Sequence, residues 1–211
     1  MLRQNFEILL FPALYCGLFV FLGLFGIHVP ILVFIAAMFS MAGAIFSKRE
    51  KWWGELLYIS GNILFMIHFF HAGLYGNMTS FMFGIAMCLW TIFQWTRKDK
   101  ATKKYLAPSA LGPLQRILLI FGLAAVMLMV SRYGIVRMLD IGILYVGVSG
   151  KLLISRKKID GWGIWLVGDV IGLLLFSITG AWFLFGRHAI CAGINIGALR
   201  NWRKELRTDR R

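Results

Sequence analysis

The sequence has few charged residues, and this scarcity excludes most soluble folds. Of its 211 residues, 15% are Asp, Glu, Lys or Arg, whereas 59% are hydrophobic and the mean hydropathy is +0.75. Soluble globular domains carry about 25% charged residues and about 45–50% apolar ones. Because this chain cannot cover itself with polar surface, a soluble enzyme is excluded and an all-α polytopic membrane protein is predicted.

Cysteine and histidine are also scarce. The three cysteines, Cys16, Cys88 and Cys191, are scattered through apolar stretches and form neither a disulfide framework nor a metal-binding spacing. The sequence contains no His-Glu-x-x-His, Gly-x-Ser-x-Gly or Walker motif. We therefore expect no enzymatic activity, no catalytic residue, no metal and no cofactor. Haem stays open as an alternative, because its two axial ligands could be His68 and His71, one helical turn apart.

Acidic residues are fewer than half as numerous as basic ones, which gives a net charge of +14. A basic chain can bind nucleic acid, but these Lys and Arg residues lie between apolar stretches. If the amino terminus is cytoplasmic, every Lys and Arg except Arg132, Arg137 and Arg187 falls on the cytoplasmic side. This bias predicts cytoplasmic locations for both termini. We expect contact with the lipid bilayer and its anionic lipids, and no binding of nucleic acid.

Apolar stretches long enough to cross about 30 Å of hydrocarbon predict about eight transmembrane helices. They cover residues 5–27, 30–47, 52–74, 77–96, 113–131, 134–155, 161–183 and 185–203. Gly76 and Asn77 are predicted to form a tight turn, and the one long polar stretch is 97–112. The first helix is interpreted as a span, because it contains Glu7 and is too long for the apolar part of a signal peptide.

The sequence aligns with itself when it is shifted by 107 positions, and no gap is needed. The identical pairs include Gly43 with Gly150, Arg49 with Arg156, Lys51 with Lys158, Gly61 with Gly168, Phe69 with Phe176, Gly73 with Gly180 and Trp95 with Trp202. An offset of four helices keeps equivalent segments in the same membrane direction, so a parallel repeat is predicted. Transporters are commonly built this way, with the substrate site between the two halves near the midplane. A duplicated membrane protein that transports nothing is the alternative.

The repeat predicts a three-one-three arrangement of helices, preceded by one additional helix. The predicted segments are an amino-terminal extra transmembrane helix (1–29), a first three-helix repeat (30–96), a basic cytoplasmic linker and linking helix (97–133), a second three-helix repeat (134–204) and a basic cytoplasmic tail (205–211). The linking helix adds one membrane crossing, so the second triplet has the same orientation across the membrane as the first.

Polar residues inside the predicted helices mark a candidate substrate site. Burying an Asp at the centre of a membrane helix costs about 2.5 to 3.5 kcal/mol, so Asp169 is predicted to bind substrate or a coupling ion. Trp162 and Trp165 share its helix face by their spacing. Tyr58 and Asn62 form the repeat-related face in the first half. Each face carries an aromatic side chain beside a hydrogen-bonding side chain. The aromatic side chain can stack on a flat polar ring of a ligand, and the hydrogen-bonding side chain can bind its hydroxyl groups.

The last helix of each repeat adds further candidates. His188 and Asn195 lie on one stripe of the final helix, and Phe81 and Cys88 lie on the helix predicted over 77–96. Asn195 has an alternative role, which is to bond a neighbouring helix. Asp169 has two alternatives, namely a structural pair with a neighbouring group and the proton carrier of a proton-coupled transporter.

Small and aromatic residues are predicted to have structural roles. The glycines predicted to permit close helix contact are Gly43, Gly61, Gly150 and Gly168. Trp95 and Trp202 are predicted to be anchors at the membrane–water interface, because they lie near the cytoplasmic helix ends.

Together these residues resemble the Pnu-type vitamin transporters, whose best-known members carry nicotinamide riboside. The resemblance covers about residues 40 to 205. In the first repeat it rests on Ala-Gly-Leu-Tyr-Gly-Asn-Met over 72–78 and on Trp95. In the second repeat it rests on Arg156-Lys157-Lys158, Trp162, Trp165, Asp169-Val170-Ile171, Gly180 and Trp202-Arg203-Lys204.

The resemblance implies a fold like that of the SWEET sugar transporters, a homotrimer, and a bacterial inner-membrane location. It also implies facilitated diffusion of nicotinamide riboside that is made one-way by intracellular phosphorylation. Phe81 and Cys88 stand where the family commonly has Asn and Gln, and His188 stands where the family usually has Tyr. Thiamine or another nucleoside-like vitamin is therefore the alternative substrate.

Overall fold

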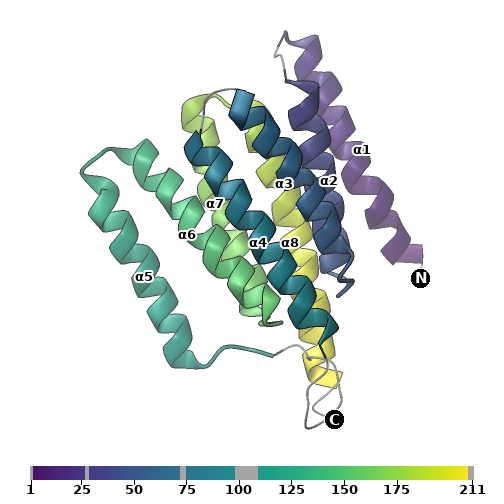
Figure 1. The fold of residues 1–211 in the computed structure, drawn as a ribbon, viewed down its shortest axis with the longest axis vertical. Coiled ribbons are helices and arrows are strands. Elements are labelled where there is room, and N and C mark those ends of the chain that lie inside the picture. The colour runs from purple at the N-terminus through teal and green to yellow at the C-terminus, as the bar shows by residue number, and fades with distance from the viewer. Residues whose placement is uncertain (1, 27–28, 72–74, 98–108, 209–211) are drawn as a thin grey trace. The chain divides into compact units, whose positions relative to one another are not determined.

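The computed structural model describes residues 2–26, 29–71, 75–97 and 109–208, and within these ranges every regular element is an α-helix. The helices are α1 (Leu2–Leu24), α2 (Ile31–Ser47), α3 (Gly54–His71), α4 (Tyr75–Thr96), α5 (Pro113–Ser131), α6 (Ile135–Ser155), α7 (Asp160–Thr179) and α8 (Trp182–Thr208), as Figure 1 shows. The predicted all-α class and the eight helices are confirmed. Residues 98–108 of the predicted polar linker lie outside the described residues.

Several predicted boundaries are wrong. α1 covers Leu2–Leu24 and not 5–27, and α8 covers Trp182–Thr208 and not 185–203. The seventh helix ends at Thr179 and not at residue 183, because Gly180 adopts a left-handed conformation (φ 70°) that terminates an α-helix. The fourth helix begins at Tyr75, so Gly76 and Asn77 lie inside a helix and not in a turn. The turn propensity of a Gly-Asn pair is weak enough for the surrounding helix to override it.

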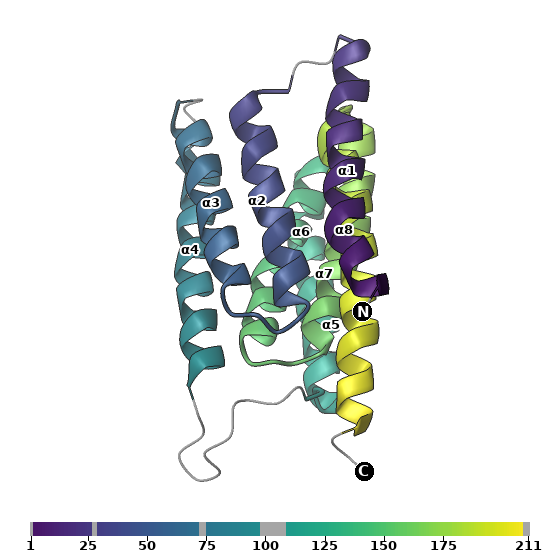
Figure 2. The same cartoon turned by 90° about the vertical axis from the view of Figure 1, so that its right-hand side faces the viewer.

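The chain forms two compact units, Met1–Tyr105 and Leu106–Arg211. In the first unit α1, α2, α3 and α4 pack side by side in chain order, and Figures 1 and 2 show this row from two directions. In the second unit α5, α6, α7 and α8 pack in the same order. Each unit therefore contains one repeated triplet and the helix that precedes it.

The repeat is visible in the backbone. Glu50 (φ 56°) and Lys157 (φ 51°) are the non-glycine residues with positive φ in the described part of the chain, and they lie 107 positions apart. Each occupies the turn after the first helix of a triplet. The next residue closes the turn in both units, since Lys51 N–H donates to the Phe46 carbonyl (3.1 Å) and Lys158 N–H donates to the Leu153 carbonyl (2.8 Å). The two units thus share an uncommon turn geometry.

The predicted close helix contacts are present at Gly43, Gly61, Gly150 and Gly168. A Cβ added to Gly61 would lie 2.7 Å from the carbonyl oxygen of Ala36 on α2. A Cβ added to Gly168 would lie 2.7 Å from a methyl group of Val146 on α6. These glycines let the first two helices of each triplet approach more closely than any other residue would allow.

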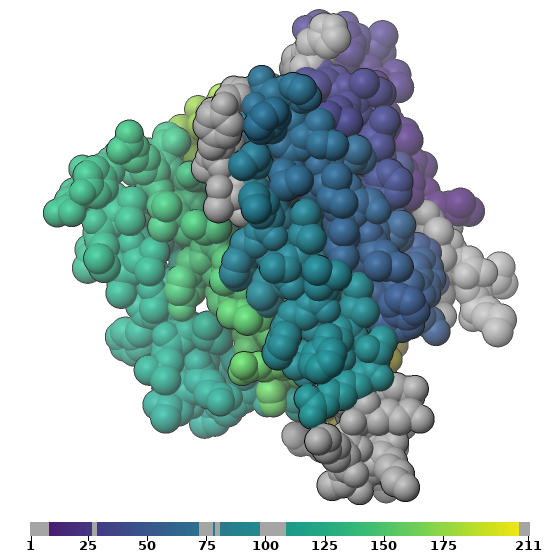
Figure 3. All heavy atoms as spheres, in the orientation of Figure 1, coloured from purple at the N-terminus to yellow at the C-terminus, as the bar shows by residue number. Residues whose placement is uncertain are grey.

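Three helices in the described part of the chain, α5, α6 and α7, are long and apolar enough to cross a membrane. Shorter apolar stretches occur in α1, α2 and α4. No residue of α5 is buried, and its apolar side chains, such as those of Leu118, Phe121 and Leu128, are exposed. Figure 3 shows the atoms of α5 in the teal-green colour of residues 113–131. In a bilayer this surface contacts lipid tails or protein.

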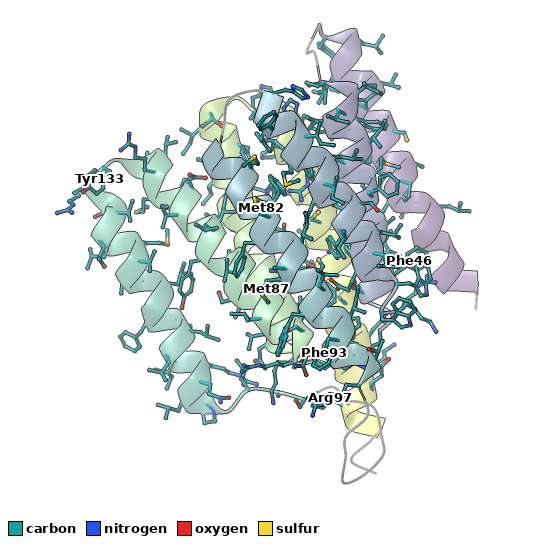
Figure 4. The ribbon with its side chains drawn as sticks, viewed as in Figure 1. Phe46, Met82, Met87, Phe93, Arg97 and Tyr133 are labelled. Carbon is teal, nitrogen blue, oxygen red and sulfur yellow. The ribbon has the colours of Figure 1, made fainter. Side chains whose placement is uncertain are left out.

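Arginine side chains near the helix ends lie over aromatic rings. At the end of α4 the Arg97 guanidinium lies 5.8 Å from the centroid of Phe93, and Figure 4 labels both residues. At the turn between α5 and α6 the Arg132 guanidinium lies 4.8 Å from the centroid of Tyr133. Such cation–π contacts occur within about 6 Å and suit the boundary between apolar and polar surroundings.

The predicted interfacial role of Trp95 and Trp202 is wrong. Both indoles are buried inside their units, and Trp202 packs edge-on against Trp162 with 5.6 Å between the ring centroids. Trp162 and Trp202 are among the largest fully buried side chains described. Nearness to a helix end indicates the depth of a residue, whereas its helix face decides whether it meets protein or lipid.

The end of the linker is bound to the turn between α6 and α7. The Ser109 N–H donates to the Lys157 carbonyl (3.0 Å). The Ser109 carbonyl accepts from the Ile159 N–H (2.9 Å). Asp160 accepts hydrogen bonds from the Leu111 N–H (2.7 Å) and from Arg116 Nε (2.7 Å). We call the segment from Ser109 to the start of α5 the linker strap.

Candidate functional site

Three predicted residues form one hydrogen-bonded group in the second unit. Asp169 on α7 lies between His188 and Asn195 on α8, with His188 Nδ1 3.0 Å from Asp169 Oδ1 and Asn195 Nδ2 donating to Asp169 Oδ2 at 2.7 Å. All three are buried, with exposed fractions of 6%, 9% and 5% respectively. His188 and Asn195 lie two turns apart on one face of α8, so both reach the same carboxylate. We call this group the polar triad.

The helix face of α7 explains the position of the His188 ring. Gly172 lies one turn beyond Asp169, and a Cβ added there would lie 2.7 Å from His188 Nδ1. Phe176 follows after another turn and stacks on the imidazole, with 5.3 Å between centroids and 24° between planes. The carboxylate, the missing side chain and the aromatic ring together fix the imidazole. Sequence analysis missed Gly172, because its repeat-related position holds Phe65.

The hydrogen-bonding capacity of the triad is only partly used. Each oxygen of the Asp169 carboxylate accepts one bond, from His188 and from Asn195. Among the residues that the structure describes, His188 Nε2 and Asn195 Oδ1 have no hydrogen-bond partner. These two atoms can accept hydrogen bonds from a ligand, beside a carboxylate that supplies negative charge.

The repeat-related positions in the first unit are Asn62 on α3 and Phe81 and Cys88 on α4. The Asn62 amide packs against Gly84, where an added Cβ would lie 2.8 Å from Asn62 Nδ2. Cys88 is buried. The first unit therefore keeps one amide at the position of Asp169, and has no hydrogen-bonding side chain at the position of His188.

Aromatic rings replace the histidine contact in the first unit. Phe81 stacks on Phe65, with 4.9 Å between centroids and 20° between planes, and on Phe69, with 5.5 Å and 11°. Phe65 stands at the position of Gly172 and Phe81 at that of His188. The two units thus use the same positions, once for an apolar stack and once for a polar triad.

The predicted aromatic residues form a second group in each unit. Trp162 packs edge-on against Trp165 (5.5 Å, 89°), and Trp165 Nε1 donates to the Gly147 carbonyl at 3.2 Å. Trp162 is fully buried, and its Nε1 has no hydrogen-bond partner in the described structure. Tyr58 lies against Gly43, where an added Cβ would be 2.9 Å from the phenol ring. Within each unit these rings contact other parts of the protein.

Glu55 is a buried acid that sequence analysis missed. It lies at the start of α3, is fully buried, and accepts a hydrogen bond from Ser47 Oγ at 2.9 Å. An acid in the first turn of a helix is usually interpreted as a surface residue. The repeat gives a usable signal, because the equivalent position holds Trp162.

The two histidines considered as haem ligands lie on α3. His68 contacts Phe69 edge-on at 5.2 Å, and His71 contacts Phe70 edge-on at 5.8 Å. Within the described ranges, no three His, Cys, Asp or Glu side chains are placed to hold a metal ion.

Comparisons with known proteins agree on one family. The family model described as "Nicotinamide mononucleotide transporter" matches residues 30–204. Two curated relatives, both named "Nicotinamide riboside transporter PnuC" and found in Escherichia coli (strain K12) and Shigella flexneri, are each 21% identical over 215 residues, covering 83% of this chain and 90% of the relative. A solved structure described as "Crystal structure of the Vitamin B3 transporter PnuC" matches with a TM-score of 0.76 at 15% identity, covering 99% of this chain and 93% of the other.

Proposed function

The chain belongs to the nicotinamide mononucleotide transporter family, and on this premise we propose that it carries nicotinamide riboside across the bacterial inner membrane. The names of the two curated relatives support the riboside as substrate. The asymmetric distribution of Lys and Arg supports a multi-pass orientation with both termini in the cytoplasm.

The polar triad is the observation that carries this proposal. It offers the negative charge of Asp169 and two hydrogen-bond acceptors, His188 Nε2 and Asn195 Oδ1. Nicotinamide riboside has a positively charged pyridinium ring, hydroxyl and amide donors, and no phosphate. A mononucleotide adds a phosphate, whose negative charge is repelled by a buried carboxylate. The triad therefore favours the riboside over its phosphate ester.

We propose uniport by alternating access as the mechanism. The sequence has no Walker motif, so this chain's own ATP hydrolysis does not drive transport. The substrate would move down its concentration gradient, and an intracellular kinase would trap it by adding a phosphate. The charge of the product would then prevent its return.

Replacing Asp169 by Asn tests the site. Asp169→Asn removes the negative charge and puts an amide donor against one of the donors of His188 or Asn195, so uptake of labelled nicotinamide riboside should fall at least tenfold, roughly the effect of 1.4 kcal/mol. Membrane insertion should remain normal. Asp140→Asn is the matched control, because Asp140 is an exposed acid on α6, and its uptake should be unchanged. Normal uptake by well-inserted Asp169→Asn protein would remove Asp169 from the mechanism.

Transport by purified protein in liposomes tests the energetics. Uptake of nicotinamide riboside should stop at equal concentrations inside and outside, and an uncoupler should leave it unchanged. Nicotinamide mononucleotide should not compete. Accumulation driven by a proton gradient would contradict uniport and favour a proton-coupled mechanism through Asp169.

We further propose a homotrimer, which rests on the family resemblance. The exposed apolar surface of α5 supports an association inside the membrane. Mass measurement of the detergent-solubilised complex tests this proposal, and a monomer at all concentrations would contradict it.

A further inference from the structure

We propose that His188, through its Nε2 atom, is a hydrogen-bonding contact of the polar triad with the ligand, and that Asp169 orients the His188 ring in addition to supplying negative charge. The inference rests on the proposed function, because the ligand considered is nicotinamide riboside. It deepens that proposal by assigning different roles to two neighbouring residues. His188 also stands where the sequence resemblance places Tyr in related chains, so the role concerns a residue particular to this chain.

The hydrogen bonds define the orientation of the imidazole. A carboxylate can only accept, so the bond at 3.0 Å between Asp169 Oδ1 and His188 Nδ1 places the ring proton on Nδ1. In the neutral ring, Nε2 then carries a lone pair and is an acceptor. Asp169 Oδ2 is already bonded to Asn195 at 2.7 Å. Nε2 has no partner among the described residues and is therefore the ring atom available to a ligand.

The charge of the ligand favours the neutral imidazole. A pyridinium cation beside the Asp169 carboxylate gives a buried group with no net charge. A protonated His188 would add an uncompensated positive charge in surroundings where an unpaired charge is costly. In the loaded protein, a neutral His188 therefore accepts a hydrogen bond from a hydroxyl or amide donor of the ligand.

The packing of the ring supports a role that depends on orientation. Gly172 leaves no side chain between α7 and the imidazole, and Phe176 stacks on the ring. An alanine at position 172 would bring a Cβ within 2.7 to 2.8 Å of Nδ1, Cε1 and Cγ of His188, so the ring would have to shift. Asp169, Gly172 and Phe176 of α7 therefore hold the His188 ring in one orientation, which a directional hydrogen bond to a ligand requires.

Two substitutions of His188 distinguish the roles of its two nitrogens. The amide of His188→Asn lies near the position of Nδ1, so it can still donate to Asp169 but offers nothing at the position of Nε2. The amide of His188→Gln reaches the position of Nε2 and can still accept from a ligand. The first unit shows that an aromatic ring fits the equivalent position, since Phe81 is there, so His188→Phe removes both nitrogens and keeps the ring shape.

The experiment measures the dissociation constant of nicotinamide riboside for detergent-purified protein, with monodispersity and thermal unfolding as checks of folding. We expect His188→Gln to stay within about threefold of the wild type, and His188→Asn and His188→Phe to bind at least about tenfold more weakly. Equal affinities of the Gln and Asn variants, or tighter binding by Asn, would overturn the assignment of Nε2.

A glycine pair supplies a test that leaves His188 in place. Gly172→Ala should weaken binding by about tenfold. The added Cβ displaces the His188 imidazole, and with it the Nε2 atom that bonds the ligand. Gly163→Ala is the matched control on α7, since an added Cβ there meets no atom within 4 Å, and its affinity should equal that of the wild type. Unchanged affinity of folded Gly172→Ala would count against a ligand contact by His188. Failure of the wild type to bind the riboside would overturn the proposed function itself.

Discussion

Replacing Gly61 by Ala is expected to destabilise the first unit by forcing α2 and α3 apart. The added Cβ would lie 2.6 Å from Ser40 Oγ, 2.7 Å from the Ala36 carbonyl oxygen and 3.1 Å from the Ser40 nitrogen. Two of these three atoms belong to the backbone of α2, which cannot rotate away as a side chain can. Ordinary carbon contacts lie near 3.5 to 4.0 Å, so the helices must separate by several tenths of an ångström, roughly.

The magnitude follows from two opposing effects. Overpacking a close contact costs about 1–3 kcal/mol. Ala gains about 0.5–1 kcal/mol over Gly inside a helix, because Gly loses more backbone entropy on folding. The net effect of Gly61→Ala is therefore a loss of up to about 2.5 kcal/mol. Gly168→Ala should cost less, because its Cβ meets a side-chain methyl of Val146, and Gly163→Ala should show only the helix gain.

Thermal unfolding of the three variants and the wild type in one detergent measures this order. For a chain of this length 1 kcal/mol corresponds to about 2–4 °C in Tm. We expect Tm to rise from Gly61→Ala through Gly168→Ala and the wild type to Gly163→Ala. A Tm for Gly61→Ala as high as that for Gly163→Ala would refute the close approach of α2 and α3.

Three further substitutions test the remaining features. Asp160→Ala removes the two side-chain hydrogen bonds of the linker strap and leaves the backbone bonds of Ser109, and because Arg116 is half-exposed the loss should be only about 1 kcal/mol. Limited proteolysis should cut the linker faster than in the wild type. Trp202→Ala empties a fully buried site and should cost about 3–5 kcal/mol, measured as the loss of monodisperse protein after heating. Glu55→Gln keeps an acceptor for Ser47 and should be milder than Glu55→Ala, which leaves that hydroxyl without its acceptor; the two Tm values check this order.

The helices and their repetition could be predicted because both are encoded along the chain. The length of an apolar stretch fixes a membrane span, and residues 107 positions apart share their environment. The matching left-handed turns at Glu50 and Lys157 show how far the likeness extends into the backbone. Neither residue type announces such a turn in the sequence.

The candidate site could be predicted only as separate residues. Asp169, His188 and Asn195 were identifiable because polar groups inside a membrane helix need a reason. Their bonds to one another depend on which faces of α7 and α8 meet, and Gly172 helps decide that contact. The same dependence explains the error at Trp95 and Trp202, whose faces turn toward protein.

The linker strap has a consequence for the order in which the second unit is assembled. Its hydrogen bond between Leu111 and Asp160 joins residues 49 positions apart, so a ribosome must complete α5 and α6 before the partner exists. Until then α5 is kept in the bilayer by its own apolarity and by its contact with α6, from which Tyr145 donates a hydrogen bond to the Leu119 carbonyl of α5. Once α7 has been made, the bond of the linker strap to Asp160 ties the start of α5 to the start of α7, and α5 becomes part of the folded second unit.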